Sequence, residues 1–588
     1  CTALQDRPCN AENFDRMRYL ALCCDYDGTI AHHGRVDEPT LAALKRLRES
    51  GRQLVLVTGR ELDDLQKVFP HLDLFARVVA ENGALLYRPE TREEQPLDEA
   101  PPQSFVDKLI ERGVGPMSVG RVIVATWEPH EKTVLETIRD CGLELQVIFN
   151  KGAVMVLPAG VNKATGLRAA LAELNLSPHN AVAVGDAEND HAFFSICECA
   201  VAVANALPAV KEKADIVTFG DHGAGVTELI EEMLADDLAS RDSGPLARHN
   251  IRLGKSVEGK PIGLSPFRVS ALAVGSSGSG KSTVVAGLVE RLRAAHYNFC
   301  IIDPEGDYDS VESAVVLGNP EHAPTIDECL QLLNRPDQNA VINLLGVKLE
   351  DRPLFFLSLF ARIRELRART GRPHWLIVDE AHHAIPANWR PTDQNLPERL
   401  EGVVMVSVRP NLIAPAVLRA LETLIVLGDK PREMLREFID ANRATAVADV
   451  PDALEAGTAV LWNKTGNGAP TVVHVEPSRT ERRRHLRKYA EGELPEDRSF
   501  YFRGPAGKLN LRAQNLIQFM NLGDGVDDET WLFHLQRGEM SRWLREGIKD
   551  EPLAAQAAAI ERNRQLDAGA SRRKLRELIE ATYTLPAQ

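Results

Sequence analysis

The chain has 588 residues, of which 44% are hydrophobic and 26% are charged, and its formal net charge is −15. A chain of this length is too long for one hydrophobic core and implies roughly three or four domains, and its composition excludes wholesale disorder. The negative charge argues against a protein that coats nucleic acid over its whole surface, but it leaves room for a local basic channel in an oligomer.

The cysteines and the hydropathy pattern indicate where the protein works. Nine cysteines are scattered along the chain, and several stand inside apolar, strand-like runs, which is typical of buried thiols in a reducing cytosol. No apolar run approaches the roughly 20 residues needed to span a bilayer, and no signal peptide precedes the first predicted strand. We therefore expect a cytoplasmic protein without a membrane segment.

Three segments between residues 15 and 240 share one pattern, an apolar strand-like run that ends in a small polar loop and leads into a helical pattern. They read RYLALCCDYDGT, GRQLVLVTGR and AVAVGDAEND. This alternation predicts an α/β fold with a parallel sheet and helices on both faces, in which ligands bind at the carboxyl ends of the strands. The polar residues at the predicted strand ends are Asp25, Asp27, Thr58, Asp186 and Asp190.

The paired acids of DYDGT predict phosphoryl transfer. A carboxylate that attacks phosphorus forms an aspartyl-phosphate and divides one difficult hydrolysis into two easier steps, and a second acid must protonate the leaving oxygen and later activate water. We expect Asp25 to be the nucleophile and Asp27 the acid and base. A divalent cation must screen the nucleophile's charge from the phosphate, and Mg²⁺ suits clustered carboxylates. Its predicted ligands are Asp25, Asp27, Asp186 and Asp190.

Two further side chains complete this predicted site. Thr58 offers a hydroxyl to a phosphoryl oxygen, and Lys163, in the helix-opening segment AGVNKATGL, places a cation beside the phosphate and the nucleophile. A single DxD motif is also compatible with a solvated turn or a helix cap. Three strand ends of one design in the same region favour the catalytic interpretation.

Together these motifs resemble the haloacid dehalogenase superfamily, with DYDGT as its first motif, VTGR as its second, Lys163 as its third and GDAEND as its fourth. The ENGA segment at residues 81–84 and the stretch after it resemble the capped subgroup, which includes sugar-phosphate and Cof-type phosphatases. The resemblance implies a Rossmann-like core over residues 15–83 and 161–240 and an α/β cap over residues 84–160. It also implies magnesium dependence and a small phosphorylated substrate.

A second phosphate-binding motif, GSSGSGKST, begins at Gly275 between a predicted strand and a predicted amphipathic helix. Its glycines let backbone N–H groups close around phosphates, and the helix N-terminus favours negative charge. We expect Lys281 to reach the β- and γ-phosphates of ATP and Ser282 to hold Mg²⁺. The predicted ATP-binding residues of this motif are Gly275, Gly278, Gly280, Lys281, Ser282 and Thr283.

The segment HWLIVDEAHH supplies the expected partner of this motif. Its apolar run ends in Asp379 and Glu380, which places one carboxylate beside the metal and one where it polarises water. Two other strand ends, in NFCIIDPEGDY and VVMVSVRPN, resemble the HerA/FtsK-type motor ATPases when they are taken together with the two nucleotide motifs. The resemblance implies that Ser407 or Arg409 senses the γ-phosphate.

The resemblance to these motors covers roughly residues 245–480 and implies a RecA-like P-loop NTPase domain that forms a homo-oligomer, usually a hexameric ring. In such rings an arginine from a neighbouring subunit completes each site, and Arg390, Arg409 and Arg419 are all candidates. Full-length HerA-like motors often carry a β-barrel before the P-loop, whereas this chain carries the phosphatase-like module there. That difference puts DNA translocation in doubt.

The last part of the chain, residues 490–588, is predicted to be a small α-helical domain. Its aromatic and arginine side chains are compatible with stacking on nucleic-acid bases, but their spacing favours core packing. The basic run ERRRHLRKY that precedes it is more typical of a solvated helix face or linker than of a nucleic-acid patch. The apolar residues that recur at mostly helical offsets are Trp531, Leu532, Leu535, Trp543 and Leu544.

Three functions are compatible with this combination of modules. The first is a capped phosphatase for a small phosphorylated substrate, regulated or assembled by an oligomeric ATPase. The second is an ATP-driven HerA-like motor or defence complex that acts on nucleic acid, with the phosphatase module as its effector. The third is a polynucleotide kinase/phosphatase, which also joins the two kinds of site. The cap-like insertion, the Asp379–Glu380 pair and the DPEGDY turn argue against the third function, because a simple kinase needs none of them.

Overall fold

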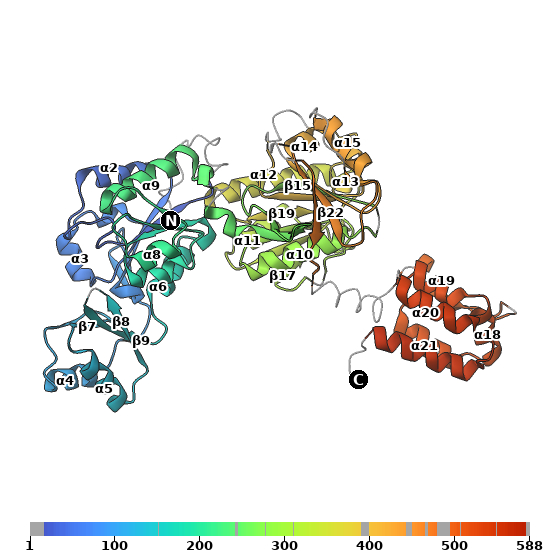
Figure 1. Cartoon of the computed structure of the whole chain (residues 1–588), viewed down its shortest axis with the longest axis horizontal. Helices are drawn as coiled ribbons and strands as arrows, with labels where there is room; N and C mark the ends of the chain where they lie inside the picture. The colour runs from blue at the N-terminus through green and yellow to red at the C-terminus, as the bar shows by residue number, and fades with distance from the viewer. Residues whose placement is uncertain are drawn as a thin grey trace. The chain divides into compact units, whose positions relative to one another are not determined.

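The computed structural model describes residues 17–583 except 151, 242–244, 277, 310, 390–398, 443–449, 465–468, 479–493, 495, 506 and 549. It divides into two compact units, one formed by residues 1–281 and 291–476 and the other by residues 282–290 and 477–588. The predicted α/β class is confirmed by two large, mostly parallel sheets with helices around them, followed by a helical C-terminal region (Figure 1). None of the described helices is both long and apolar enough to cross a membrane. Arg390 and the basic run at residues 481–489 lie outside the described residues.

The first sheet has eight strands in the order β12–β11–β10–β1–β2–β3–β4–β5, which places β1 between β10 and β2. All three of these strands run parallel, so Cys24 at the end of β1 lies opposite Val184 and Leu56. Every side chain of β1 is fully buried, as expected for a parallel strand with helices over both faces of its sheet. The strands are β1 (Ala21–Cys24), β2 (Gln53–Val57), β3 (Arg77–Ala80), β4 (Leu85–Arg88), β5 (Glu93–Pro96), β10 (Ala181–Gly185), β11 (Cys199–Ala202) and β12 (Ile216–Val217), and the helices are α2 (Glu38–Glu49), α3 (Leu62–Val68), α6 (Lys163–Glu173), α7 (His191–Phe194), α8 (Pro208–Lys213) and α9 (His222–Asp236).

A small four-stranded sheet lies in the chain between β5 and α6, in the order β6–β7–β9–β8 with every pairing antiparallel. Two helices pack against it around the buried side chains Phe105, Val134 and Val156 (Figure 1). This separate core matches the α/β insertion that the sequence predicts. Its elements are α4 (Gln103–Glu111), β6 (Met117–Val119), β7 (Val124–Trp127), α5 (Glu131–Cys141), β8 (Leu145–Asn150) and β9 (Ala153–Pro158).

The second large sheet has eleven strands in the order β14–β13–β23–β22–β21–β15–β20–β19–β16–β18–β17. From β21 to β17 the neighbouring strands run parallel, and β22, β23, β13 and β14 extend the sheet with antiparallel pairings. The strands are β13 (Ile251–Ser256), β14 (Pro261–Leu264), β15 (Ser270–Val274), β16 (Phe299–Asp303), β17 (Ala314–Leu317), β18 (Asn339–Asn343), β19 (Trp375–Val378), β20 (Val403–Ser407), β21 (Thr423–Leu427), β22 (Thr458–Asn463) and β23 (Thr471–Val475), and the helices are α10 (Lys281–Ala294), α11 (Ile326–Leu333), α12 (Arg352–Thr370), α13 (Ala381–Ala384), α14 (Pro415–Ala420) and α15 (Pro431–Asn442).

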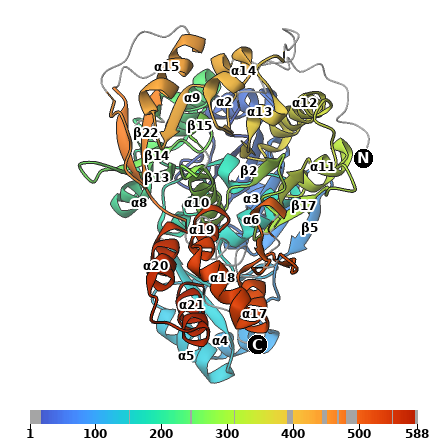
Figure 2. The same ribbon diagram turned by 90° about the vertical axis from the view of Figure 1, so that its right-hand side faces the viewer.

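The C-terminal region is a helical bundle with one short hairpin, and Figure 2 shows its helices gathered together. The expected packing is confirmed, because Trp531, Leu535, Trp543 and Leu544 are all buried in one core. The elements are β24 (Phe500–Phe502), β25 (Leu511–Ala513), α17 (Leu516–Gly525), α18 (Asp528–Gln536), α19 (Glu539–Glu546), α20 (Glu551–Arg562) and α21 (Ala568–Thr582).

A buried polar network joins the two large sheets of the first unit. The Glu198 carboxylate, which precedes β11, accepts hydrogen bonds from Tyr297 Oη at 2.8 Å and from Arg18 Nη2 at 2.9 Å. His179 Nδ1 lies 2.7 Å from Glu198 Oε2, and His179 Nε2 lies 2.9 Å from the carbonyl oxygen of Ala295, just after α10. Because both ring nitrogens face acceptors, both bonds form only with a protonated ring. The contact therefore consists of paired charges and not of apolar surface alone.

Candidate active sites

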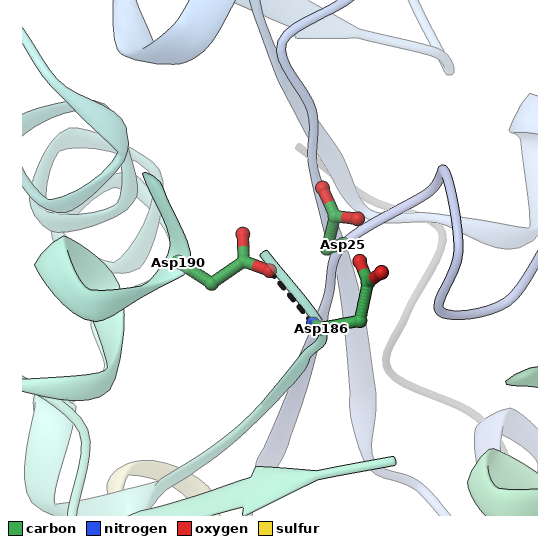
Figure 3. A group of neighbouring side chains, drawn as sticks. All are labelled: Asp25, Asp186 and Asp190. Carbon is green, nitrogen blue, oxygen red and sulfur yellow. Dashed lines mark hydrogen bonds between the residues drawn. The ribbon is translucent and has the colours of Figure 1, made fainter. Parts of the chain in front are cut away.

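The first candidate site is a group of buried carboxylates at the ends of neighbouring strands. Asp25 follows β1, Asp186 follows β10, and Asp190 ends the short 3₁₀ turn after it. One oxygen atom from each lies within 4.8 Å of the others, and Figure 3 shows the three side chains converging. The parallel pairing of β1 and β10 brings Asp25 and Asp186 together although 160 residues separate them in the chain.

Lys163 links two members of this group. Its Nζ donates hydrogen bonds of 2.6 Å to Asp25 Oδ1 and of 2.6 Å to Asp190 Oδ1. The lysine is the first residue of α6, whose start is fixed by a capping box between Asn162 and Thr165. The Lys163 side chain is 2% exposed, so its charge acts on the aspartates with little screening by solvent.

The electrostatics of the group favour a bound cation. Burial raises the pKa of Asp25, and the charges of Asp190 and Asp186 raise it further against the opposing effect of Lys163. Burial alone would lower the pKa of Lys163, but its two aspartate partners outweigh that effect and raise it. Three buried carboxylates against one ammonium leave excess negative charge in a site made of oxygen donors. Such a donor set fits a hard divalent cation such as Mg²⁺.

The three aspartates differ in how much of each carboxylate remains available. Asp190 Oδ2 accepts hydrogen bonds from the backbone N–H groups of Asp186 and Ala187 at 2.8 and 2.9 Å, and its Oδ1 accepts from Lys163. Asp190 therefore holds the loop and the lysine in place. Thr29 Oγ1 lies 3.4 Å from both Asp25 Oδ2 and Asp186 Oδ1, and so bridges the two remaining carboxylates.

Asp27 stands apart from this group. Its carboxylate pairs with Arg60 in a two-pronged contact, with Nε to Oδ2 at 2.6 Å and Nη2 to Oδ1 at 2.7 Å. The Asp27 side chain is 41% exposed, whereas the grouped aspartates are buried. Arg60, the last residue of VTGR, is a partner that the sequence interpretation missed, although it stands inside a motif that was recognised. Thr58 is buried after β2, and its Oγ1 accepts from the Arg60 N–H at 3.1 Å.

A glycine is required beside the carboxylates. Gly28 has φ +89°, and a Cβ there would lie 2.3 Å from Asp186 Oδ2. A larger residue would strain the backbone and push the Asp186 carboxylate out of place. The glycine of DYDGT therefore keeps the Asp186 carboxylate in place beside Asp25.

The cap is attached to the core through Glu81 of the ENGA segment. The buried Glu81 carboxylate accepts hydrogen bonds from the backbone N–H groups of Arg121, Val122 and Ile123 at 2.7–2.9 Å. On the core side, a Cβ at Gly59 would lie 3.8 Å from the cap side chain Met155. The cap strands thus come close to the VTGR loop beside the first site.

The second candidate site is the P-loop after β15. Gly278 and Gly280 have φ +81° and +99°, a backbone conformation that other residues rarely adopt. Lys281 begins α10, and its Nζ donates to the carbonyl oxygens of Gly275 and Ser276 at 2.8 and 3.3 Å. Ser282 and Thr283 follow in the first turn of the helix. The predicted residues thus form a loop that leads into a helix N-terminus, as an anion-binding site requires.

The acid pair follows β19, which is separated from β15 by β20 alone. Asp379 is buried, and Glu380 Oε2 is a buried oxygen that accepts no hydrogen bond from the described residues, although His382 Nδ1 lies 3.3 Å from it. Burial and the charge of Asp379 raise the pKa of Glu380 to about 7 against the opposing charge of Lys281. A buried carboxylate oxygen that accepts no hydrogen bond within the described structure is suited to accept a proton from water or to orient it.

The structure distinguishes the two candidate γ-phosphate sensors. Ser407 ends β20, and its Oγ lies 3.2 Å from His382 Nδ1, which in turn lies 3.3 Å from Glu380 Oε2. Arg409 instead pairs with Glu433 at 2.5 Å and with Glu437, both in α15. His382, which the sequence interpretation passed over, therefore connects Ser407 with the acid pair.

The fold and the first site define a class of protein, a capped α/β hydrolase. The end of its central strand places a buried aspartate beside a lysine and two further acids. Residues 22–134 and 124–230 match the haloacid dehalogenase-like hydrolases. Phosphoglycolate phosphatase 2 of Saccharolobus solfataricus is 32% identical over 222 residues, which are 37% of this chain and 93% of that protein. A phosphoglycolate phosphatase of Methanothermobacter thermautotrophicus is 32% identical over 226 residues, 36% of this chain and 98% of that protein. The chain belongs to the haloacid dehalogenase-like hydrolase family.

A second match covers the P-loop region. Residues 268–352 match the central domain of helicase HerA, so a HerA-like P-loop domain follows the hydrolase in one chain, as the motifs predict. Among solved structures, a haloacid dehalogenase-like hydrolase from Bacteroides thetaiotaomicron aligns at 19% identity with a TM-score of 0.33, over 37% of this chain and 99% of that one.

Proposed function

We propose that the first module, residues 15–83 and 161–240 with a cap over residues 84–160, is a magnesium-dependent phosphatase that works through an aspartyl-phosphate. The observation that carries this proposal is the buried Asp25 held at 2.6 Å by Lys163, beside Asp186. Asp25 and Asp186 would hold Mg²⁺, with Asp190 as the third acid of the group, and the ion would neutralise charge on the phosphate. The Asp27 side chain lies outside this ligand group, so we assign it to proton transfer.

The residues divide the reaction into two balanced steps. In the first step an Asp25 oxygen bonds to phosphorus, the bond to the leaving oxygen breaks, and Asp27 gives that oxygen a proton. In the second step water attacks phosphorus, Asp27 takes the water's proton, and the Asp25–phosphorus bond breaks to release phosphate. Arg60 orients Asp27 through their two-pronged contact, and the Thr58 hydroxyl and Lys163 bind phosphoryl oxygens.

The substrate we propose is a small phosphorylated molecule. The cap reaches the VTGR loop, and the curated relatives over this region are phosphoglycolate phosphatases. Phosphoglycolate is therefore the first compound to test. Because the seven cysteines that the structure describes are free, we place this activity in a reducing compartment, the cytoplasm.

We propose that the second module, residues 245–480, is an ATPase that forms a homo-oligomer and regulates or assembles the phosphatase. Lys281 would bind the phosphates of ATP. Ser282 and Asp379 would hold its Mg²⁺, and Glu380 would orient the attacking water. The charged network around Glu198 supports coupling, because it ties the hydrolase sheet to the end of α10, the helix that begins at the P-loop. The helical region at residues 490–588 would form a separate domain.

Two variants test these assignments on the full chain. Asp25→Asn should abolish Mg²⁺-dependent phosphate release from phosphoglycolate or p-nitrophenyl phosphate and leave ATP hydrolysis intact. Lys281→Ala should abolish ATP hydrolysis, and a change in its phosphatase rate would demonstrate coupling between the modules. Phosphatase activity that survives in Asp25→Asn would disprove the proposed nucleophile. Native mass spectrometry with and without ATP measures the oligomer.

A further inference from the structure

The C-terminal unit contains a pocket of about 600 Å³ bordered by β24, the loop after it, α18 and α19. The pocket has more arginines than acids, although the chain as a whole carries a charge of −15. No motif in the sequence marks it, and neither proposed phosphate site includes any of its residues. Its charged side chains are the four arginines Arg498, Arg503, Arg537 and Arg542 and the two glutamates Glu539 and Glu546.

Most of this positive charge is not neutralised within the protein. Arg498, Arg503 and Arg542 form no salt bridge with any residue that the structure describes, and only Arg537 pairs with an acid, Glu539, at 2.8 Å. A bound anion would balance this charge.

Aromatic rings stand beside the guanidinium groups. The Arg503 guanidinium lies over the Tyr501 ring at 5.3 Å, and that of Arg537 lies over the Phe533 ring at 4.9 Å. Both rings line the pocket and are half-buried, unlike the tryptophans that fill the core of this unit. Aromatic faces together with arginines bind the bases and the phosphates of nucleotides.

A buried histidine supports one wall of the pocket. His534 is buried, and its Nε2 accepts hydrogen bonds from the N–H groups of Arg503 and Gly504 at 3.0 and 3.4 Å. Its Nδ1 donates to Glu539 at 2.5 Å, which fixes the neutral tautomer that the other two bonds require. Gly504 has φ +65°, and a Cβ there would lie 2.9 Å from Thr530 Oγ1. These contacts fix the backbone of Arg503 and Gly504 at the edge of the pocket.

We propose that this pocket binds a nucleoside phosphate, with the phosphate between Arg498 and Arg542 and the base against Tyr501 and Phe533. The ligand is either a free nucleotide or one unit of a single-stranded nucleic acid, since both present a phosphate next to a planar base. The site is independent of the phosphatase and ATPase assignments. If the pocket binds a single strand, it is a local nucleic-acid contact of the kind that a net negative charge on the whole chain still permits.

The test is binding of a fluorescein-labelled 20-nucleotide oligothymidylate to the full chain, measured by fluorescence anisotropy in EDTA so that metal-dependent turnover is blocked. The double variant Arg498→Ala/Arg542→Ala should bind roughly tenfold more weakly per arginine removed. The slope of the logarithm of its binding constant against the logarithm of the salt concentration should become shallower by about 0.7 for each lost phosphate contact. The matched control Arg564→Ala/Arg573→Ala removes the same charge from exposed positions outside the pocket and should bind as the wild type does.

Two further measurements complete the test. Tyr501→Leu removes a stacking face without changing charge, so it should weaken binding and leave the salt slope unchanged, even if the arginine variant fails to fold. Competition with thymidine 5′-monophosphate distinguishes the two ligand sources. If the mononucleotide displaces the labelled oligonucleotide at a comparable concentration, the ligand is a free nucleotide. If the oligonucleotide stays bound, the ligand is a single strand. The proposal is overturned if neither ligand binds the wild type, or if the control loses as much affinity as the pocket variant.

Discussion

Replacement of Glu198 by glutamine tests the charged contact between the hydrolase sheet and the sheet of the HerA-like domain. The change keeps the shape of the side chain and removes its charge, while Arg18, His179 and Tyr297 remain around it. Breaking a buried ion pair by removing one partner costs about 3–5 kcal/mol. We expect the first unit to lose stability by an amount of this order.

The lowered pKa of Glu198 expresses the same stabilisation as a dependence on pH. Burial raises it, but the hydrogen bond from His179 and the charges of Arg18 and His249 outweigh burial and lower it from 4.5 to about 2. Since the folded value is the lower one, ionised Glu198 stabilises the fold fully above pH 4.5, and this contribution is lost as pH falls toward 2. A shift of this size corresponds to roughly 3 kcal/mol, in agreement with the ion-pair estimate.

Thermal unfolding followed by near-ultraviolet circular dichroism is the assay. For a unit of about 450 residues, 3 kcal/mol lowers Tm by roughly 3–4 °C at pH 7. The difference between Glu198→Gln and the wild type should shrink below pH 4.5. Glu212→Gln, at an exposed position of the same module, is the control and should melt as the wild type does. Equal Tm values for Glu198→Gln and the wild type at pH 7 would refute the view that charge holds this contact.

Three other substitutions test the two proposed catalytic sites. Lys163→Met should lower phosphatase turnover by about 10³-fold, because it removes a buried positive charge beside Asp25, the proposed nucleophile. Steady-state phosphate release measures the loss. Gly28→Ala should lower turnover by about 10²-fold, because the added methyl group displaces the Asp186 carboxylate. The control is Gly113→Ala, at a glycine that also has positive φ but has open space around it, and it should leave turnover unchanged. Equal effects of the two substitutions would contradict the steric argument. Glu380→Gln should retain ATP binding, measured by equilibrium dialysis, and lose hydrolysis by about 10²–10⁴-fold. Hydrolysis at the wild-type rate would remove Glu380 from its proposed role.

The catalytic residues that the sequence predicts lie mainly at the ends of parallel strands. Asp25, Thr58 and Asp186 each follow an apolar run directly, and parallel pairing brings such ends to one edge of a sheet whatever lies between them in the chain. The same reasoning places Asp379 and Ser407 at the ends of neighbouring strands of the second sheet. A local pattern and one rule of sheet geometry are sufficient for these residues.

Partners formed by long side chains follow no such rule. Arg60 reaches Asp27 from another strand end, and Arg409 turns to the acids of α15 and not to the acid pair after β19. An arginine side chain has several rotatable bonds, so its partner depends on which acids the folded chain brings within reach. Those distances are set only when the helices have packed.

The amino-acid sequence by itself determined the two modules, the strand ends that carry their chemistry and the helical character of the last region, because each of these rests on residues that are close together in the chain. Only the tertiary structure decided which carboxylates share Lys163, how Glu198 joins the two sheets, and that arginines and aromatic rings of the C-terminal unit border one basic pocket. The physical reason is that charge pairing and cavity shape act over a few ångströms in space, between residues whose separation along the chain gives no sign of their proximity.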